Sequence, residues 1–371
     1  MVTVGGVAAL LDRLWPEAWA ESWDNVGLLL GARDRMVHRC LCALDADAST
    51  IEQAAAANAE LLLVHHPLPF RPLRRVLQED PTGAAVLLAA ARGVAVYAAH
   101  TNFDAHPEGV SRALADALGL RTEAPLQISG REALYKLVVF VPAGHEEALL
   151  TALAAAGAGR LGNYSHCSFV ASGTGTFLPL AGARPFVGEV GVLERQSEVR
   201  LEVLVPERVR ADVTAALRRT HPYEEPAFDY LRLEHEGPAH GYGMVGTLSR
   251  RMSLAALARL CARRLDAPPT RFVGDPARLV HRVAVCGGAG MGFADAARRA
   301  GADVLVTADI RYHEAREAEA GGLALVDPGH QATEAPAVPV MAEALRAALR
   351  QAGHTVEVLA APQRVDVWRR P

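Results

Sequence analysis

The sequence LLLVHHPLPF, residues 61–70, combines a short apolar run with two adjacent histidines and a proline. Four apolar residues in such a run are typical of a buried β-strand. Pro67 cannot donate a hydrogen bond to a neighbouring strand, and it biases His66 towards an extended backbone, so we expect the strand to end where the histidines begin. Binding sites of α/β proteins form at the ends of strands. His65 and His66 are therefore candidate site residues.

The composition is that of a folded protein large enough for two domains. Half of the 371 residues are hydrophobic and 22% are charged, which argues against a disordered chain. The net charge of −4 argues against nucleic-acid binding, and Lys136 is the only lysine, which excludes a phosphate loop of the G-K-[ST] type. We expect no membrane partner, because no apolar segment reaches membrane-spanning length. The five cysteines contain no C-x-x-C pair and the N-terminus lacks signal-peptide features, so we expect reduced thiols in a cytoplasmic protein.

The two ends of the chain share one pattern. Residues 40–110 and residues 281–334 both read as strand, helix, strand with polar residues at its end, helix, and again strand with polar residues at its end. We interpret this order as an internal pseudo-duplication. We expect an α/β fold in which residues 1–129 and residues 237–371 form two halves of one core.

The middle of the chain has a different pattern. Residues 136–159 and 200–220 each read as a strand, a Val-Pro break and a helix, and further strands are predicted at residues 167–177, 186–193 and 228–233. This order predicts a ferredoxin-like βαββαβ domain of the α+β class, inserted at residues 130–236. Linkers rich in glycine, proline and polar residues flank it.

Each outer half supplies candidate metal ligands from the ends of its second and third predicted strands. They are His65, His66, His100 and Asp104 in the first half and Asp309, His313, His330 and Glu334 in the second. Three pairs among them are four residues apart, namely His100/Asp104, Asp309/His313 and His330/Glu334. If a helix begins after each strand, both side chains of a pair lie on one helical face. We therefore expect one site that collects imidazoles and carboxylates from both halves.

This ligand chemistry indicates metal ions. Imidazole and carboxylate ligands without thiolate suit zinc, iron, manganese or cobalt, and five or more of them with a bridging carboxylate suit two divalent ions about 3.5 to 4 Å apart. We assign the metal ligands as His65, His66, Asp104, His330 and Glu334, with Glu334 as the bridge. The remaining residues, His100, Asp309 and His313, are then candidates for contacts with the ligands or a substrate. Of these, His100 and His313 are the candidate catalytic residues that move protons.

The glycine-rich segment CGGAGMG, residues 286–292, follows a predicted strand of the second half. It could be a phosphate cradle, but it lacks the G-x-G-x-x-G pattern. A tight turn or a close approach of the backbone to another group is the better interpretation. Cys40 and Cys42 share one face of a strand and are interpreted as core residues.

Taken together, the motifs resemble one family. The segments WDNVGLLLG, LLLVHHPLPF, AAHTNFDAHPEGV, VAVCGGAGMG, VLVTADIRYHEA and LALVDPGHQATE are similar to motifs of the Nif-three-like proteins, a dinuclear metal centre family often labelled GTP cyclohydrolase 1 type 2 homologs. The middle segments GNYSHCSFVASGTGTFLP and HPYEEPAFDY resemble the PII-like or CutA-like domain inserted in its longer members. The resemblance implies a toroidal homohexamer whose two-metal sites face an internal cavity. It also implies metal ligands that match His65, His66, Asp104, His330 and Glu334.

Two functions are open at this point. The first is a metal-dependent hydrolase acting on a nucleotide, phosphoester or amide, although the sequence contains no N-K-x-D motif for guanine. The second is a non-enzymatic metal-handling or regulatory protein whose PII-like domain binds a small ligand or a partner, through the HPYEEP turn and the GTGTF segment.

Overall fold

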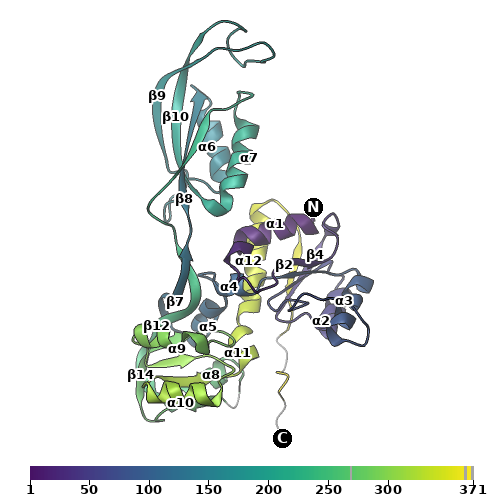
Figure 1. Cartoon of the computed structure of the whole chain (residues 1–371), viewed down its shortest axis with the longest axis vertical. Coiled ribbons are helices and arrows are strands. Elements are labelled where there is room, and N and C mark those ends of the chain that lie inside the picture. The colour runs from purple at the N-terminus through teal and green to yellow at the C-terminus, as the bar shows by residue number, and fades with distance from the viewer. Residues whose placement is uncertain (268–269, 363–365, 369–371) are drawn as a thin grey trace. The chain divides into compact units, whose positions relative to one another are not determined.

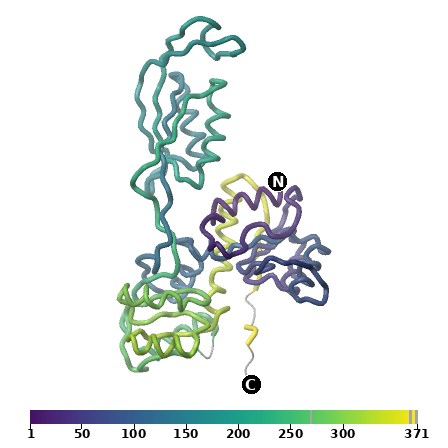
Figure 2. Tube along the Cα trace, viewed as in Figure 1, coloured from purple at the N-terminus to yellow at the C-terminus, as the bar shows by residue number. Residues whose placement is uncertain are grey.

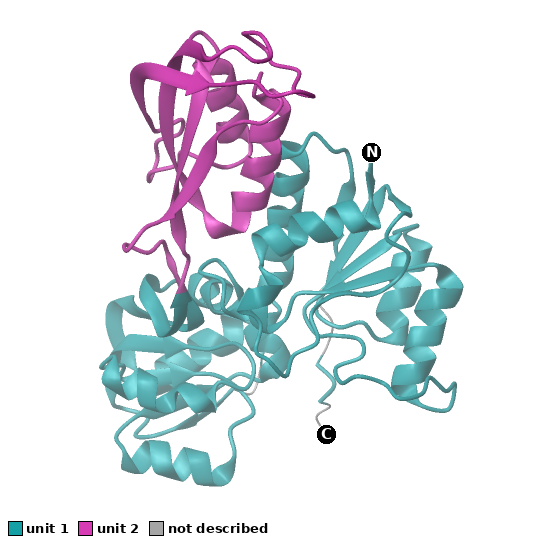
Figure 3. Cartoon of the chain, turned by 45° about the horizontal axis from the view of Figure 1, so that its top comes forward, with its two compact units in different colours: residues 1–130, 240–371 teal, residues 131–239 magenta. Residues whose placement is uncertain are grey.

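The computed structural model describes residues 1–267, 270–362 and 366–368. The chain divides into two compact units, coloured in Figure 3. Unit 1 consists of Met1–Gly130 and His240–Pro371, and unit 2 of Arg131–Ala239. In the trace of Figure 2 the chain leaves unit 1 through one strand and returns to it through another. Helices and sheets occur in both units, so the predicted mixed α/β fold is confirmed.

The first sheet of unit 1 has five strands in the order β17-β4-β5-β6-β2 (Figure 1). These strands are β2 (Gly27–Leu30), β4 (Arg39–Ala43), β5 (Leu61–Val64), β6 (Ala95–Ala98) and β17 (Glu357–Ala360). All pair in parallel except β2, which joins the edge antiparallel to β6. The helices around this sheet are α1 (Val4–Leu14), α2 (Ala48–Ala56), α3 (Pro81–Arg92) and α12 (Ala337–Gln351), and a two-stranded sheet of β1 (Val2–Thr3) and β3 (Met36–Val37) lies beside α1.

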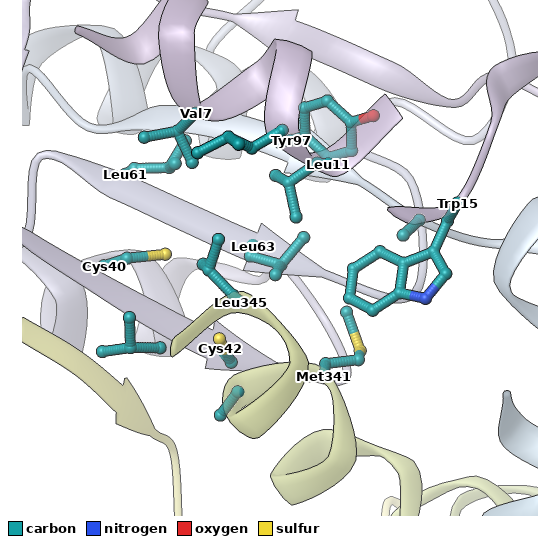
Figure 4. Close-up of a cluster of buried hydrophobic side chains, with 14 of the residues drawn as sticks. Val7, Leu11, Trp15, Cys40, Cys42, Leu61, Leu63, Tyr97, Met341 and Leu345 are labelled. Atoms are coloured by element: carbon teal, nitrogen blue, oxygen red, sulfur yellow. The ribbon is translucent and has the colours of Figure 1, made fainter. Parts of the chain in front are cut away.

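Helices cover both faces of this sheet, which explains why its central strands are apolar throughout. In β5, Leu61 and Leu63 pack against α1 and α12, whereas Leu62 and Val64 face the layer of α2 and α3. Figure 4 shows the first of these two clusters, where side chains of α1 and α12 meet those of the sheet. Cys40 and Cys42 lie in it as free, buried thiols, so their interpretation as core residues is confirmed.

The second sheet of unit 1 has six strands in the order β13-β16-β15-β14-β12-β7. These strands are β7 (Arg121–Arg131), β12 (Ala239–Ser253), β13 (Arg271–Val273), β14 (Leu279–Val285), β15 (Val304–Val306) and β16 (Ala324–Asp327). As in the first sheet, three consecutive strands are parallel and an antiparallel strand closes the edge beside the last of them. The helices of this part are α5 (Val110–Leu118) and α8 (Leu254–Arg264) on one face, and α9 (Ala294–Arg299) and α10 (Tyr312–Ala320) on the other.

The two halves exchange a helix and a strand. Helix α5 follows the strands of the first sheet in sequence, yet its Leu114 and Leu118 pack with α8 in the core of the second sheet, and β7 then pairs with β12. Conversely, α12 follows the strands of the second sheet but packs beside α1, and β17 pairs with β4. In Figure 2 the yellow α12 accordingly lies next to the purple α1. The exchange ties the two halves of unit 1 into one compact body.

Unit 2 is a four-stranded antiparallel sheet with two helices on one face. Its elements in chain order are β8 (Leu134–Pro142), α6 (Glu146–Ala155), β9 (Ser168–Phe177), β10 (Glu194–Pro206), α7 (Arg210–Thr220) and β11 (Phe228–Arg232). The strand order is β11-β8-β10-β9, and a core of alternate strand residues packs against α6 and α7. The strand predicted at residues 186–193 is wrong, since these residues form turns and loop before β10 begins at Glu194.

One expectation about local structure is corrected. Asp309 and His313 do not share a helical face, because α10 begins at Tyr312 and Asp309 adopts a left-handed backbone with φ of 55°. Within the described residues, none of the helices is both long and apolar enough to cross a membrane.

Candidate metal centre

Three short segments of unit 1 bring the predicted ligands together, each at the end of a parallel strand or one turn beyond it. His65 and His66 follow β5 directly, and Asp104 ends the single turn α4 (Thr101–Asp104) after β6. After β16 the chain turns at Gly329, which has a φ of 103°, into the short helix α11 (His330–Glu334). One helical turn separates His330 from Glu334, as their spacing predicted.

Glu334 lies at the centre of the cluster and is 96% buried. Its Oε1 atom is 3.1 Å from Nε2 of His330 and 3.8 Å from Nε2 of His65. Its Oε2 atom is 3.0 Å from Nε2 of His66. Asp104 approaches from the other side, with Oδ1 3.7 Å from Nε2 of His65. Carboxylate oxygens and imidazole nitrogens from both halves therefore converge on one small volume.

Four imidazoles are held from behind through their Nδ1 atoms. His65 bonds the carbonyl oxygen of Ala99 at 2.9 Å, and the other three bond carboxylates. These carboxylate pairs are His66 with Asp45 at 2.7 Å, His100 with Asp24 at 2.9 Å and His330 with Asp309 at 2.7 Å. In metal sites, such a bond fixes the ring and its tautomer and leaves the other nitrogen for the ion. The same arrangement recurs around every imidazole of this cluster.

His65 gives the clearest test of whether a cation fits. The carbonyl of Ala99 can only accept a hydrogen bond, so Nδ1 of His65 carries the proton. Burial lowers the pKa of His65 to about 3, so the ring is neutral. Nε2 of His65 then carries a lone pair that faces oxygens of Asp104 and Glu334. This nitrogen is fully buried and has no hydrogen-bond partner. Acceptors that face one another without a donor fit a bound cation.

The charges of the cluster show the same preference for positive charge at its centre. Burial alone would raise the pKa of Glu334, but its contacts with His330 and His66 outweigh burial and hold that pKa well below the usual range. Burial opposes protonation of His66, but bonds to Asp45 and Glu334 raise its pKa to about 10. Burial and the nearby Glu334 raise the pKa of Asp104. These shifts indicate that the buried carboxylates favour positive charge at the centre, which divalent ions would supply.

Two overlapping sets of side chains have metal-ligand geometry among the described residues. One is His65, His66 and His100, and the other is His66, His330 and Glu334; within each set the ligand atoms lie within 4.8 Å of one another. Because His66 belongs to both, the two positions are adjacent. The residues present therefore fit divalent ions. His100, which was not assigned as a metal ligand, has its ligand atom within 4.8 Å of those of His65 and His66.

The glycine-rich segment forms one wall of the centre. A Cβ atom on Gly288, which has a φ of 60°, would lie 2.3 Å from Oε1 of Glu334. The amide of Gly288 donates to Oγ1 of Thr333, and the amide of Gly290 donates to Oγ1 of Thr307. The interpretation of this segment as a close approach of the backbone is confirmed, and the group it approaches is the central carboxylate.

His100 and its partner Asp24 form a dyad at the edge of the centre. The side chain of Asp24 is fully buried, and bonds to His100 and Thr101 outweigh burial and lower its pKa to about 2. Asp24 is therefore an acceptor only, so Nδ1 of His100 carries a proton and Nε2 can accept one. No role was predicted for Asp24 from the sequence.

An aromatic surface adjoins this dyad. The ring of Phe70 lies 5.7 Å from that of His100, and Trp23 lies 6.2 Å from Phe70, with 60% of Trp23 exposed. The side chain of Asn25 donates to the carbonyl of Pro69 and so ties the two loops that carry these rings. Neither ring was predicted as a site residue.

His313 is placed differently from the other predicted residues. It is exposed near the start of α10, where its ring contacts that of Tyr312. Among the residues that the structure describes, no hydrogen bond, ion pair or ring contact joins His313 to the cluster. The catalytic role of His313 stays a prediction. Asp309, for which a contact with a metal ligand or with a substrate was expected, bonds the ligand candidate His330.

The fold and the site define an α/β protein built around a candidate metal centre of histidines and carboxylates. The chain belongs to the Duf34/NIF3 (NGG1p interacting factor 3) family, whose model matches residues 2–366. It is 40% identical over 360 residues to the "GTP cyclohydrolase 1 type 2 homolog" of Halalkalibacterium halodurans, covering 97% of this chain and 96% of that protein. It is 43% identical over 353 residues to the protein of the same name from Mycobacterium tuberculosis, covering 93% and 92%. Among solved structures, a Bacillus cereus protein related to NIF3 matches with a TM-score of 0.86 and 36% identity, over 100% of this chain and 99% of that one.

Proposed function

We propose that this protein is a metal-dependent hydrolase with two divalent ions per chain. The observation that carries the metal centre of this proposal is the neutral, fully buried His65, whose Nε2 lone pair faces carboxylate oxygens and has no hydrogen-bond donor. A binding protein without metal would gain nothing from such an arrangement, because each unpaired buried acceptor costs about 1 to 3 kcal/mol.

The metal ligands in this proposal are His65, His66, Asp104, His330 and Glu334, with Glu334 as the bridge. Its two oxygens support this role, because one contacts His330 and the other contacts His66. The mixture of nitrogen and oxygen ligands suits zinc, iron, manganese or cobalt.

Two ions bound here would lower the pKa of a coordinated water and stabilise negative charge on the substrate. The protein's own residues would supply orientation and proton transfer. Asp24 holds His100 with Nε2 free to accept a proton at the edge of the centre, which is the arrangement of a general base held by a carboxylate. The aromatic rings of Trp23 and Phe70 would hold a planar group of the substrate beside it.

The substrate class follows from these features only in outline: a nucleotide, a phosphoester or an amide. The names of the bacterial relatives contain "GTP cyclohydrolase", which motivates GTP as the first compound to test. The exposed aromatic surface supports a substrate with a planar ring.

The experiment is a turnover screen of metal-loaded protein with GTP, aryl phosphoesters and amides. We expect turnover with at least one of these substrate classes. Glu334→Ala should lose both the bound metal and the turnover. His100→Gln should retain the metal and lose the turnover. Turnover that survives in Glu334→Ala after the metal is gone would refute the metal-dependent mechanism.

Three further assignments belong to this proposal. We propose a cytoplasmic location, supported by the free thiols of all five cysteines, which lie within the described residues. We propose a toroidal homohexamer, on the resemblance to the family, with light scattering as its test. The βαββαβ order of unit 2 supports its assignment to the ferredoxin-like class.

A further inference from the structure

Unit 2 contains a cavity of about 590 Å³ that has no part in the metal centre. It lies on the face of the sheet opposite α6 and α7. In β10, Val199 and Leu201 belong to the core beneath the helices, whereas the alternating residues Glu198 and Arg200 line the cavity. Segments before and after the sheet strands, including Pro179 and Tyr223, complete the wall. The volume is within the range of about 300 to 1,000 Å³ typical of small-molecule sites.

Two glycines of the GTGTF segment shape the floor of this cavity. In the sheet, Gly173 is opposite Glu198, and Gly175 is opposite Gln196. A Cβ atom on Gly173 would meet nothing within 4 Å, so this position opens onto free space. A Cβ atom on Gly175 would lie 2.0 Å from Oε2 of Glu198, so only glycine leaves room for this carboxylate. The glycines therefore serve the cavity rather than the packing of the strand, which they weaken.

Aromatic side chains form much of the remaining wall. They are Phe140, Phe177, Phe186 and Tyr223. The ring of Tyr223 lies 5.8 Å from that of Phe177 and 6.3 Å from that of Phe186, so three of these rings are neighbours. His221 holds Tyr223 in place by accepting a hydrogen bond from its backbone amide at 3.0 Å. The HPYEEP turn is thus a built part of the wall.

The charges at the cavity are mainly negative. Glu198 is 92% buried, and the only hydrogen bond of its carboxylate among the described residues is the one donated by the Tyr223 hydroxyl, at 2.9 Å. Glu224 and Glu225 also line the cavity. The single cation of the lining, Arg200, is paired with Glu202 at 2.8 Å. A ligand that reaches Glu198 therefore meets a carboxylate that has no ion pair with a cationic side chain among the described residues.

We propose that this cavity binds an organic ammonium ion with an apolar body. The positive group would lie against Glu198 and the aromatic rings, whose faces attract cations, and the apolar part would fill the space above Gly173. An anionic ligand would meet three carboxylates, and a neutral ligand would leave Glu198 buried without its counter-charge. The site is independent of the hydrolase proposal, because its test reads binding and not turnover.

The test measures binding of small ammonium probes to the full chain by calorimetry and saturation-transfer NMR. The probes are benzyltrimethylammonium, phenethylammonium and cyclohexylmethylammonium, and the matched controls are phenylacetate and benzyl alcohol. We expect at least one ammonium probe to bind one-to-one with a Kd of about 1 mM or tighter, and the controls to bind more weakly.

Three variants connect that binding to the cavity. Glu198→Gln keeps an acceptor for Tyr223 and removes the charge, so binding should weaken by about tenfold or more. Gly173→Leu fills the open space and should abolish binding. Asp229→Asn, which removes a charge on β11 outside the cavity lining, should leave binding unchanged. Thermal melts show that each variant is folded. Absence of binding by all ammonium probes, equal binding of phenylacetate, or unchanged binding in Glu198→Gln would overturn the proposal.

Discussion

Replacing Glu334 by glutamine removes one negative charge from the middle of the cluster and changes little else. The side chain keeps its size and stays in a site where it is 96% buried. Loss of a hydrogen-bonding partner behind a metal ligand typically weakens metal affinity by 10- to 100-fold. Glu334 contacts imidazoles with both oxygens, at 3.0 and 3.1 Å, so it would be a direct and bridging ligand. We therefore expect a loss of at least about 100-fold, which is about 2.7 kcal/mol of binding free energy.

The assay is a titration of metal-free protein with zinc in competition with a chromophoric chelator at neutral pH. Glu343→Gln is the matched control, because Glu343 is an exposed carboxylate of α12 whose ion pairs are with Arg346 and Arg350 and not with the residues of the cluster. We expect the control to bind zinc like the wild type. The reasoning would be refuted if Glu334→Gln, shown by its thermal melt to be folded, also bound zinc like the wild type.

The other predictions concern the groups around the centre and the stability of the first sheet. Asp45→Asn and Asp309→Asn should each weaken zinc binding by about 10- to 100-fold in the chelator titration, because each carboxylate holds a ligand imidazole; undiminished affinity in both would contradict the site. Gly288→Ala should lower the metal content measured by plasma mass spectrometry while the chain stays folded, since its Cβ would lie 2.3 Å from Oε1 of Glu334. Glu60→Gln should destabilise the protein by about 1 kcal/mol at neutral pH, because the Glu60 carboxylate accepts two backbone hydrogen bonds at β4. Burial would raise the pKa of Glu60, but these bonds outweigh it and lower that pKa from 4.5. The stabilisation by Glu60 is therefore complete above pH 4.5 and is lost as the pH falls through the lower pKa of the folded state. In urea unfolding, the free energies of unfolding of the wild type and of Glu60→Gln should converge in acid.

The sequence predicted the segments that build the centre because each carries a local signal. The run before His65 is apolar on both faces and ends at Pro67, and β5 indeed spans Leu61–Val64. The four-residue spacing of His330 and Glu334 corresponds to the single turn of α11. Repetition of the strand and helix order in the two halves indicated that these strand ends belong to one site.

Asp24 and Asp45, the carboxylates behind His100 and His66, were not predicted, because they reach the cluster through tertiary structure alone. Asp24 bonds His100 across 76 residues, and Asp45 bonds His66 across 21. A single acidic residue in a polar loop has no spacing that links it to a distant histidine. The same reason applies to Trp23 and Phe70, which meet only because their loops are tied through Asn25.

The exchange of elements between the two halves also lies beyond a pattern-based prediction. The apolar faces of α5 and α12 show that each helix packs on a sheet but not on which one. In the structure each helix crosses to the other half, so residues 337–360 complete the first sheet and its core. The error at residues 186–193 has a different origin. Val190, Val192 and Leu193 are exposed in a loop, and Phe186 lines the cavity of unit 2, so their apolar character does not reflect a buried strand.

The central claim is that the cluster around Glu334 holds two metal ions, and metal analysis of the wild-type protein tests it most directly. The protein would be purified without chelator and without a histidine tag, and analysed by plasma mass spectrometry. The account predicts about two equivalents of divalent metal per chain. Protein that contains no metal, and that takes up none when zinc, iron, manganese or cobalt is supplied, would contradict it.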